Sequence, residues 1–87
     1  MVTYAPIQKS VEKDLRKIPG DLIPNISEHI EKLARDPVPH ESYKIASAEN
    51  LYRIRVGDYR VIYRVLHDSR EVTIFFVRHR SIAYRGL

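Results

Sequence analysis

Arginines dominate the chemistry that this 87-residue sequence offers, and they gather in its C-terminal part. Residues 51–87 carry eight Arg, no Lys and three acidic residues, whereas residues 1–50 carry seven basic and eight acidic residues. The planar fork of Arg matches a phosphate, while Lys is a hydrated point charge. Clustered arginines can stabilise the negative charge that builds on phosphoryl oxygens without a metal ion. Residues 51–87 are therefore predicted to meet a polyanion, with nucleic acid the first candidate.

The reaction that such an arginine cluster suits is phosphoryl transfer within RNA. This reaction needs a base that accepts the proton of the ribose 2′-OH and an acid that protonates the leaving 5′ oxygen. Arg stays protonated and is a poor base. The candidate proton carriers are His79, which lies between two arginines, and Tyr84. The chain has no Cys, no pair of His with metal-ligand spacing and no Gly-rich phosphate loop. We therefore expect neither a metal nor a cofactor.

A hydrophobic periodicity of two marks the elements that position these arginines. Strands are predicted over residues 51–56 and 59–66, with a tight turn at Gly57-Asp58. Side chains alternate between the two faces of a strand. One face would carry Tyr52, Ile54, Val56, Tyr59, Val61 and Tyr63. The other face, called here the arginine face, would carry Arg53, Arg55, Arg60 and Arg64. Arg55 would oppose Arg60, which is an unfavourable pair that a bound polyanion would relieve.

A third strand is predicted over residues 72–77, after a turn at residues 67–70, and a basic tail follows from Arg78. Its apolar residues on both faces indicate a central place in the sheet. A two-residue turn before this strand would direct Arg78 away from the arginine face. One extra residue or a bulge would place Arg78 on that face, and the sequence leaves both arrangements open.

The N-terminal half is predicted to form a short strand over residues 2–4 and a helical hairpin. The first helix starts at Pro6 and ends at Pro19-Gly20; its apolar stripe is Ile7, Val11, Leu15 and Ile18. The second helix is capped by Asp21 and ends at Asp36-Pro37; its stripe is Leu22, Ile23, Ile26, Ile30 and Leu33. Residues 37–50 read as irregular. The result is one α+β domain over residues 1–87: a short first strand, a helical hairpin on one sheet face and a three-stranded antiparallel meander.

No apolar run approaches the roughly 20 residues that a membrane span requires, and no secretory leader is visible. We therefore expect no membrane association and a cytoplasmic location.

The segment Leu51–Tyr63, LYRIRVGDYRVIY, closely resembles the signature hairpin of RelE/ParE-type toxins of type II toxin–antitoxin systems. Lys13-Asp14-Leu15, Ile18-Pro19 and residues 77–84 are similar to other recurring pieces of that family. The resemblance implies a βααβββ fold. It also implies an mRNA interferase of the RelE kind, which enters the 30S A site of the ribosome and cuts mRNA there by 2′-OH attack. The alternatives are a ParE-like inhibitor of DNA gyrase without nuclease activity, and an inactive basic binding module.

The resemblance assigns catalytic roles to the positions of Arg53, Arg55, Arg60, Arg78 and Tyr84. The clustering of basic residues further predicts His79 as a proton carrier, and Arg64, Arg80 and Arg85 as RNA-binding residues. Well-studied RelE toxins carry Lys at the positions of Arg53 and Arg55, so His79, Tyr84 and a ribosomal group remain candidate bases. The implied partners are a RelB-like antitoxin, the ribosome with its mRNA, and operator DNA only together with the antitoxin.

Overall fold

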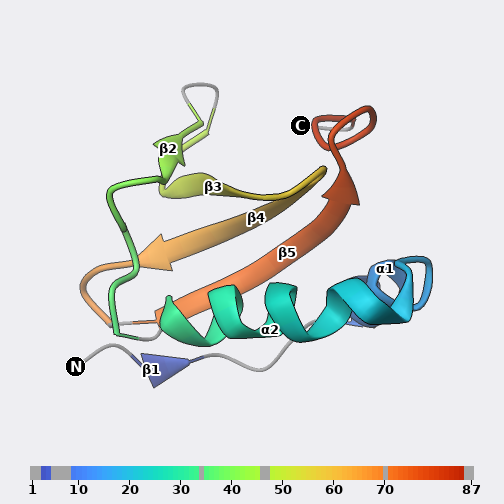
Figure 1. Cartoon of the computed structure of the whole chain (residues 1–87). Helices are drawn as coiled ribbons and strands as arrows, with labels where there is room; N and C mark the ends of the chain where they lie inside the picture. The colour runs from blue at the N-terminus through green and yellow to red at the C-terminus, as the bar shows by residue number, and fades with distance from the viewer. Residues whose placement is uncertain (1–2, 5–8, 34, 46–47, 70, 86–87) are drawn as a thin grey trace.

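A computed structural model of the chain describes residues 3–4, 9–33, 35–45, 48–69 and 71–85 (Figure 1). The strands are β1 (Thr3–Tyr4), β2 (Tyr43–Lys44), β3 (Leu51–Val56), β4 (Tyr59–Leu66) and β5 (Glu71–His79). The helices are α1 (Lys9–Arg16), a 3₁₀ turn (Gly20–Leu22) and α2 (Ile23–Lys32). The strands form one sheet in the order β1-β5-β4-β3-β2, and α1 and α2 pack on one of its faces. The predicted α+β class is confirmed. The predictions for Val2, Pro6, Ile7 and Arg70 lie outside the described residues.

The sheet face beneath the helices holds the apolar core. Val11 of α1 and Ile26 and Ile30 of α2 are buried against it, as are Ile18 and Leu33, which follow the C-terminal ends of the two helices. The six strand residues predicted to share this face all belong to this core or pack against it. The predicted alternation of side chains between the two faces of β3 and β4 is therefore confirmed. It directs the intervening arginines to the face opposite the helices.

Strand β5 lies between β1 and β4, as its apolar residues predict. It pairs parallel with β1 and antiparallel with β4. The strand is longer than predicted, because it continues through Arg78 and His79. Ile62 pairs with Phe76 but the next residue, Tyr63, pairs with Ile74, so Phe75 is the extra residue of a β-bulge. A bulge of this kind moves every later residue of the strand to the other face.

The connection between α2 and β3 is more ordered than its sequence indicates. It contains the short edge strand β2, which pairs antiparallel with β3 and which the sequence pattern did not reveal. The hydroxyl of Tyr63, a buried residue of the core, donates a hydrogen bond to the carbonyl of Pro37 at 2.7 Å. Burial raises the pKa of the Tyr63 phenol well above its usual range. This bond ties the connection to the sheet.

The start of α2 differs from the prediction. Asp21 lies in the 3₁₀ turn, and the residue before α2 is Leu22, which makes no side-chain cap. A cap at Asp21 would need the amide of the second or third helical residue, and the third would be Pro24, which has no N–H. Leu22 is 39% exposed rather than part of the buried stripe.

Within the described part of the chain, neither helix is long and apolar enough to cross a membrane.

Candidate active site

Three arginines form a row across β3, β4 and β5 on the arginine face. Arg55 pairs with Arg60, and Arg60 pairs with Arg78. The bulge at Phe75 produces the second pair, because the register of Tyr63 with Ile74 would otherwise place Val77 opposite Arg60. Neighbouring strands lie about 5 Å apart, so the row concentrates three cationic side chains on a short line. The open question of the Arg78 register is thereby answered in favour of the arginine face.

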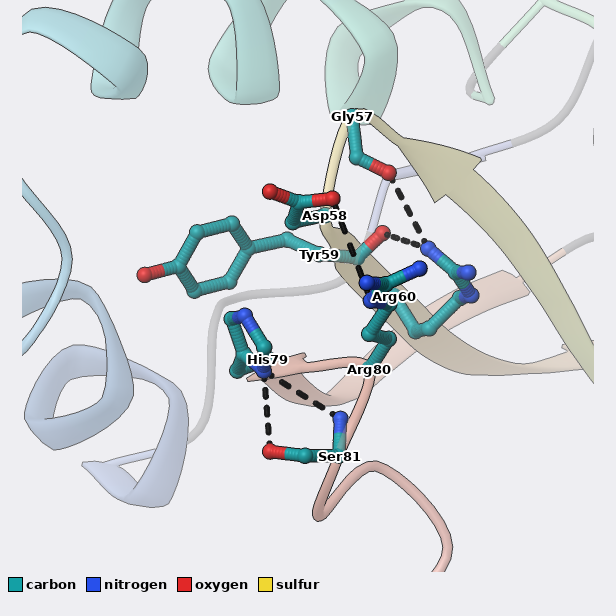
Figure 2. A network of polar contacts seen from close by, with 7 residues as sticks. All are labelled: Gly57, Asp58, Tyr59, Arg60, His79, Arg80 and Ser81. Carbon is teal, nitrogen blue, oxygen red and sulfur yellow. Dashed lines mark hydrogen bonds and ion pairs between the residues drawn. The ribbon is translucent and has the colours of Figure 1, made fainter.

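Arg60 is the buried member of this row, with 8% of the residue exposed. Its Nη1 donates to the carbonyls of Gly57 at 3.1 Å and Tyr59 at 2.9 Å, which fixes the side chain against the hairpin turn (Figure 2). Among the described residues, no carboxylate pairs with it. Burial lowers the pKa of Arg60, and the nearby charges of Arg55 and Arg53 lower it further. A desolvated cation without a counter-ion is suited to receive an anion.

Arg78 is held at the edge of the row by contacts with α1 and the C-terminal turn. Its Nε lies 3.9 Å from Asp14 Oδ2, and its Nη1 donates to the Arg85 carbonyl at 3.2 Å. The guanidinium carbon is 3.8 Å from the centre of the Phe76 ring. The same Asp14 oxygen accepts a hydrogen bond from the Val77 amide at 3.1 Å. Among the residues that the structure describes, Arg78 therefore has a carboxylate partner, whereas Arg55 and Arg60 have none.

Arg53 lies beside the row, two residues before Arg55 on β3, and contacts two tyrosines. Its guanidinium is 4.6 Å from the ring centre of Tyr43 and 5.8 Å from that of Tyr84. Tyr84 also lies near enough to Arg60 to oppose the lowering of that pKa. The C-terminal turn thus brings Tyr84 to the arginine face, beside the residues that the sequence analysis grouped with it.

His79 is not brought to this face. It pairs with Tyr59 on the side of the helices, and the two rings meet edge to face with centres 5.6 Å apart (Figure 2). Its Nδ1 accepts the Ser81 amide at 3.2 Å and lies 2.9 Å from the Ser81 hydroxyl. His79 lines a cleft of about 340 Å³ together with Asp14, Lys17, Arg78 and Arg85. This position separates His79 from Arg55 and Arg60 by the thickness of the sheet.

Comparison with known proteins connects this arrangement with a toxin family. Residues 7–84 match the family described as the ParE toxin of the type II toxin–antitoxin system parDE. A Methanocaldococcus jannaschii protein, provisionally named toxin RelE1, is 35% identical over an alignment of 83 residues that covers 92% of each chain. The chain belongs to the RelE/ParE superfamily of toxins.

Two solved relatives refine this placement. The toxin–antitoxin complex RelBE2 from Mycobacterium tuberculosis matches with a TM-score of 0.76 and 26% identity, over 91% of this chain and 98% of that chain. The RelB–RelE complex from Methanococcus jannaschii matches with a TM-score of 0.72 and 31% identity, over 95% of each chain. The chain is thus a RelE-type toxin, and the ParE-type gyrase inhibitor is not favoured.

The three further arginines expected to bind RNA occupy different places in the toxin. Arg64 lies on the arginine face, with its guanidinium 5.4 Å from the Phe75 ring centre and its Nε buried without a hydrogen-bond partner in the described residues. Arg80 makes an exposed ion pair with Asp58 at 3.9 Å (Figure 2). Arg85 lies at the cleft beside His79. The described residues contain no cluster of His, Asp and Glu that could hold a metal ion.

Two residues of this toxin's site were not predicted from its sequence. Tyr43 lies in a two-residue strand, and only its pairing with Arg53 reveals its place on the arginine face. Asp14 belongs to a segment that resembles the family, but its contact with Arg78 joins residues 64 positions apart. Neither position carries a local signal, because both contacts arise from tertiary packing.

Proposed function

We propose that this RelE-type toxin is a ribosome-dependent endoribonuclease that cleaves mRNA in the A site. The observation that supports the proposal is Arg60, a buried cation with no carboxylate partner among the described residues, flanked in register by Arg55 and Arg78. Such a row is complementary to a phosphate that gains negative charge during the reaction. A surface that only attracts RNA would not need one of its cations desolvated and fixed.

In the proposed reaction the ribose 2′ oxygen attacks the adjacent phosphorus and the bond from phosphorus to the 5′ oxygen breaks. The products are a cyclic phosphate and a free 5′ hydroxyl. Arg60 donates to the phosphoryl oxygens as charge builds on them, and Arg55 binds the neighbouring backbone. Arg78 contributes once the phosphate competes with Asp14 for its guanidinium.

Two proton transfers complete the reaction. We assign the acid that protonates the 5′ oxygen to Tyr84, because its ring lies on the arginine face near Arg53 and Arg60. We assign the base that accepts the 2′ proton to the ribosome, because His79 lies on the opposite face of β5. This division explains why activity would depend on the ribosome.

The proposed regulatory partner is a RelB-like antitoxin. The two solved relatives above are antitoxin complexes. The net charge of +5 in residues 51–87, eight Arg against three acidic residues, suits an acidic partner segment. We propose that the pair acts in the cytoplasm and binds operator DNA only as a complex.

The test is cleavage mapping on translating ribosomes with purified toxin and its Arg60→Ala variant. Loss of one preorganised donor is expected to lower the cleavage rate about 100- to 1,000-fold. Arg35→Ala is the matched control, since it removes one exposed arginine from the segment that follows α2. Because Arg60 also bonds the hairpin turn, Arg55→Ala is included, and the melting temperature of each variant is recorded.

The expected result is cleavage that requires ribosomes and is lost in Arg60→Ala and Arg55→Ala but kept in Arg35→Ala. Wild-type rates in both arginine-face variants would refute the site assignment. An intact translation system together with blocked gyrase supercoiling would instead identify a ParE-like activity.

A further inference from the structure

Two exposed tyrosines from distant parts of the chain meet at Arg53, beside the row of arginines. Tyr43 is 56% exposed and Tyr84 is 45% exposed, although both are large aromatic residues. Their ring centres lie 4.6 Å and 5.8 Å from the Arg53 guanidinium carbon. The three side chains form a mixed aromatic and cationic surface, named here the stacking cluster.

The backbone holds this cluster in place from both sides. Tyr43 and Arg53 are register partners in the antiparallel pair of β2 and β3, so their side chains share the arginine face. The C-terminal turn is anchored by the Arg80 amide, which donates to the Asp58 carbonyl at 2.8 Å. Ala83, which is buried, fastens the same turn next to Tyr84. The cluster is thus assembled by the fold before any ligand arrives.

The chemistry of the stacking cluster differs from that of the neighbouring row. Arg55 and Arg60 offer charge and hydrogen bonds, which suit phosphate oxygens. Aromatic rings and a planar guanidinium offer flat faces, which suit an unpaired nucleobase. Arg53 lies two residues from Arg55 on β3, a separation of about 7 Å along the strand. Flat faces and phosphate donors therefore lie within the reach of one nucleotide.

We propose that Tyr43, together with Arg53 and Tyr84, is a binding subsite for an unpaired RNA base. The subsite rests on the proposed function, and it would hold the base of a nucleotide whose backbone lies on Arg55 and Arg60. Stacking tolerates every base because each has a π face, so Tyr43 contributes affinity and positioning with little sequence preference. Tyr43 makes no proton transfer in this role.

The experiment measures toxin binding to ribosomes whose A-site codon is protected from cleavage by 2′-O-methyl groups. Matched mRNAs carry an abasic nucleotide at one codon position at a time. The proteins are wild type, Tyr43→Ala, Tyr43→Phe and Val38→Ala, the last removing another exposed apolar side chain from the same connection. Circular dichroism checks that each variant is folded.

At one codon position, the abasic nucleotide is expected to weaken wild-type binding about 5- to 100-fold. Tyr43→Ala should bind the intact codon more weakly than wild type does, by a factor of similar size. Its affinity should fall little further when that codon carries the abasic nucleotide. Tyr43→Phe keeps the ring and is expected to bind as wild type does, as is Val38→Ala.

If Tyr43→Ala lowered the affinity by the same factor for the intact codon and for the abasic codon, the stacking role would be overturned. The proposed function would remain in place. The stacking role would also be overturned if Tyr43→Ala bound programmed ribosomes normally but failed to bind an acidic RelB-like peptide, because Tyr43 would then serve the protein interface. A wild-type toxin that does not bind programmed ribosomes would overturn the proposed function itself.

Discussion

The two faces of strands β3, β4 and β5 differ in how their side chains are packed and paired. Beneath the helices the side chains are apolar and closely packed, and the hydroxyl of the buried Tyr63 has a hydrogen-bond acceptor. On the arginine face, Arg55 opposes Arg60, and Arg60 is buried without a carboxylate partner among the described residues. The contrast indicates that the helix face supplies the stability that lets the arginine face keep mutually repelling cations for a ligand.

The strongest test of this contrast uses two adjacent residues of β3. Ile54 is 1% exposed in the core, whereas Arg55 is exposed on the arginine face. Ile54→Ala is expected to lower the free energy of unfolding by about 2–5 kcal/mol, because it removes packed atoms and leaves a cavity. Arg55→Ala should change it by no more than about 0.5 kcal/mol, while cleavage falls. Urea unfolding measures the first effect and ribosomal cleavage the second. A large loss of stability in Arg55→Ala would break the division between the faces.

Tyr63→Phe examines the polar group of the helix face. Removing the hydroxyl leaves the Pro37 carbonyl without its donor, at an expected cost of about 1–3 kcal/mol. The pKa of Tyr63 is raised above its ordinary value of 10.0, so the folded chain holds this proton at a pH where the unfolded chain has lost it. Stability therefore falls as the pH rises above that value.

Urea unfolding at neutral pH and again above pH 10.0 measures both effects. The alkaline loss should be smaller in Tyr63→Phe than in wild type, since the variant lacks this titrating group. Equal alkaline losses in the two proteins would contradict the assignment of the effect to Tyr63.

The smallest effect concerns Asp14, the one described carboxylate that pairs with a member of the arginine row. In Asp14→Asn the side-chain oxygen can still accept the Val77 amide, but the charge opposite Arg78 is gone. Affinity for programmed ribosomes is expected to rise about 2- to 5-fold, because a single ion pair near the protein surface typically makes a contribution of this size. Asp14→Ala, which also removes the acceptor, is the comparison for stability. Weaker binding in Asp14→Asn would show that the carboxylate positions Arg78 instead of competing for it.

Local pattern was sufficient for much of the fold. The alternation in Leu51–Val56 and Tyr59–Leu66 assigned both faces of the hairpin, and the apolar run of β5 indicated its interior place. The turn at Gly57-Asp58 was also predicted, and Gly57 adopts a φ of +60° there, which favours glycine. These features depend on residues close together in the chain.

Features that depend on register or on distant contacts were not predicted. The bulge at Phe75 decides the face of Arg78, and no residue type near it distinguishes a bulge from a regular strand. His79 was grouped with its neighbours Arg78 and Arg80, but alternation along β5 places it beside Tyr59 on the helix side, away from Arg55 and Arg60. The pairing of β2 decides the place of Tyr43, and two residues are too few to show a period. The roles proposed for the site residues remain predictions.

The contact of Asp14 with the Val77 amide has a consequence for how the free toxin behaves at high concentration. Among the described residues, β1 pairs with β5 at Glu71 and Val72, and no strand pairs with the Val77 end of β5 on the side away from β4. An exposed strand edge is a template for pairing with another chain, and it promotes aggregation. Asp14 occupies the Val77 donor and places a carboxylate on that edge, with α1 packed beside it. The helix thereby shields β5 from strands of other molecules.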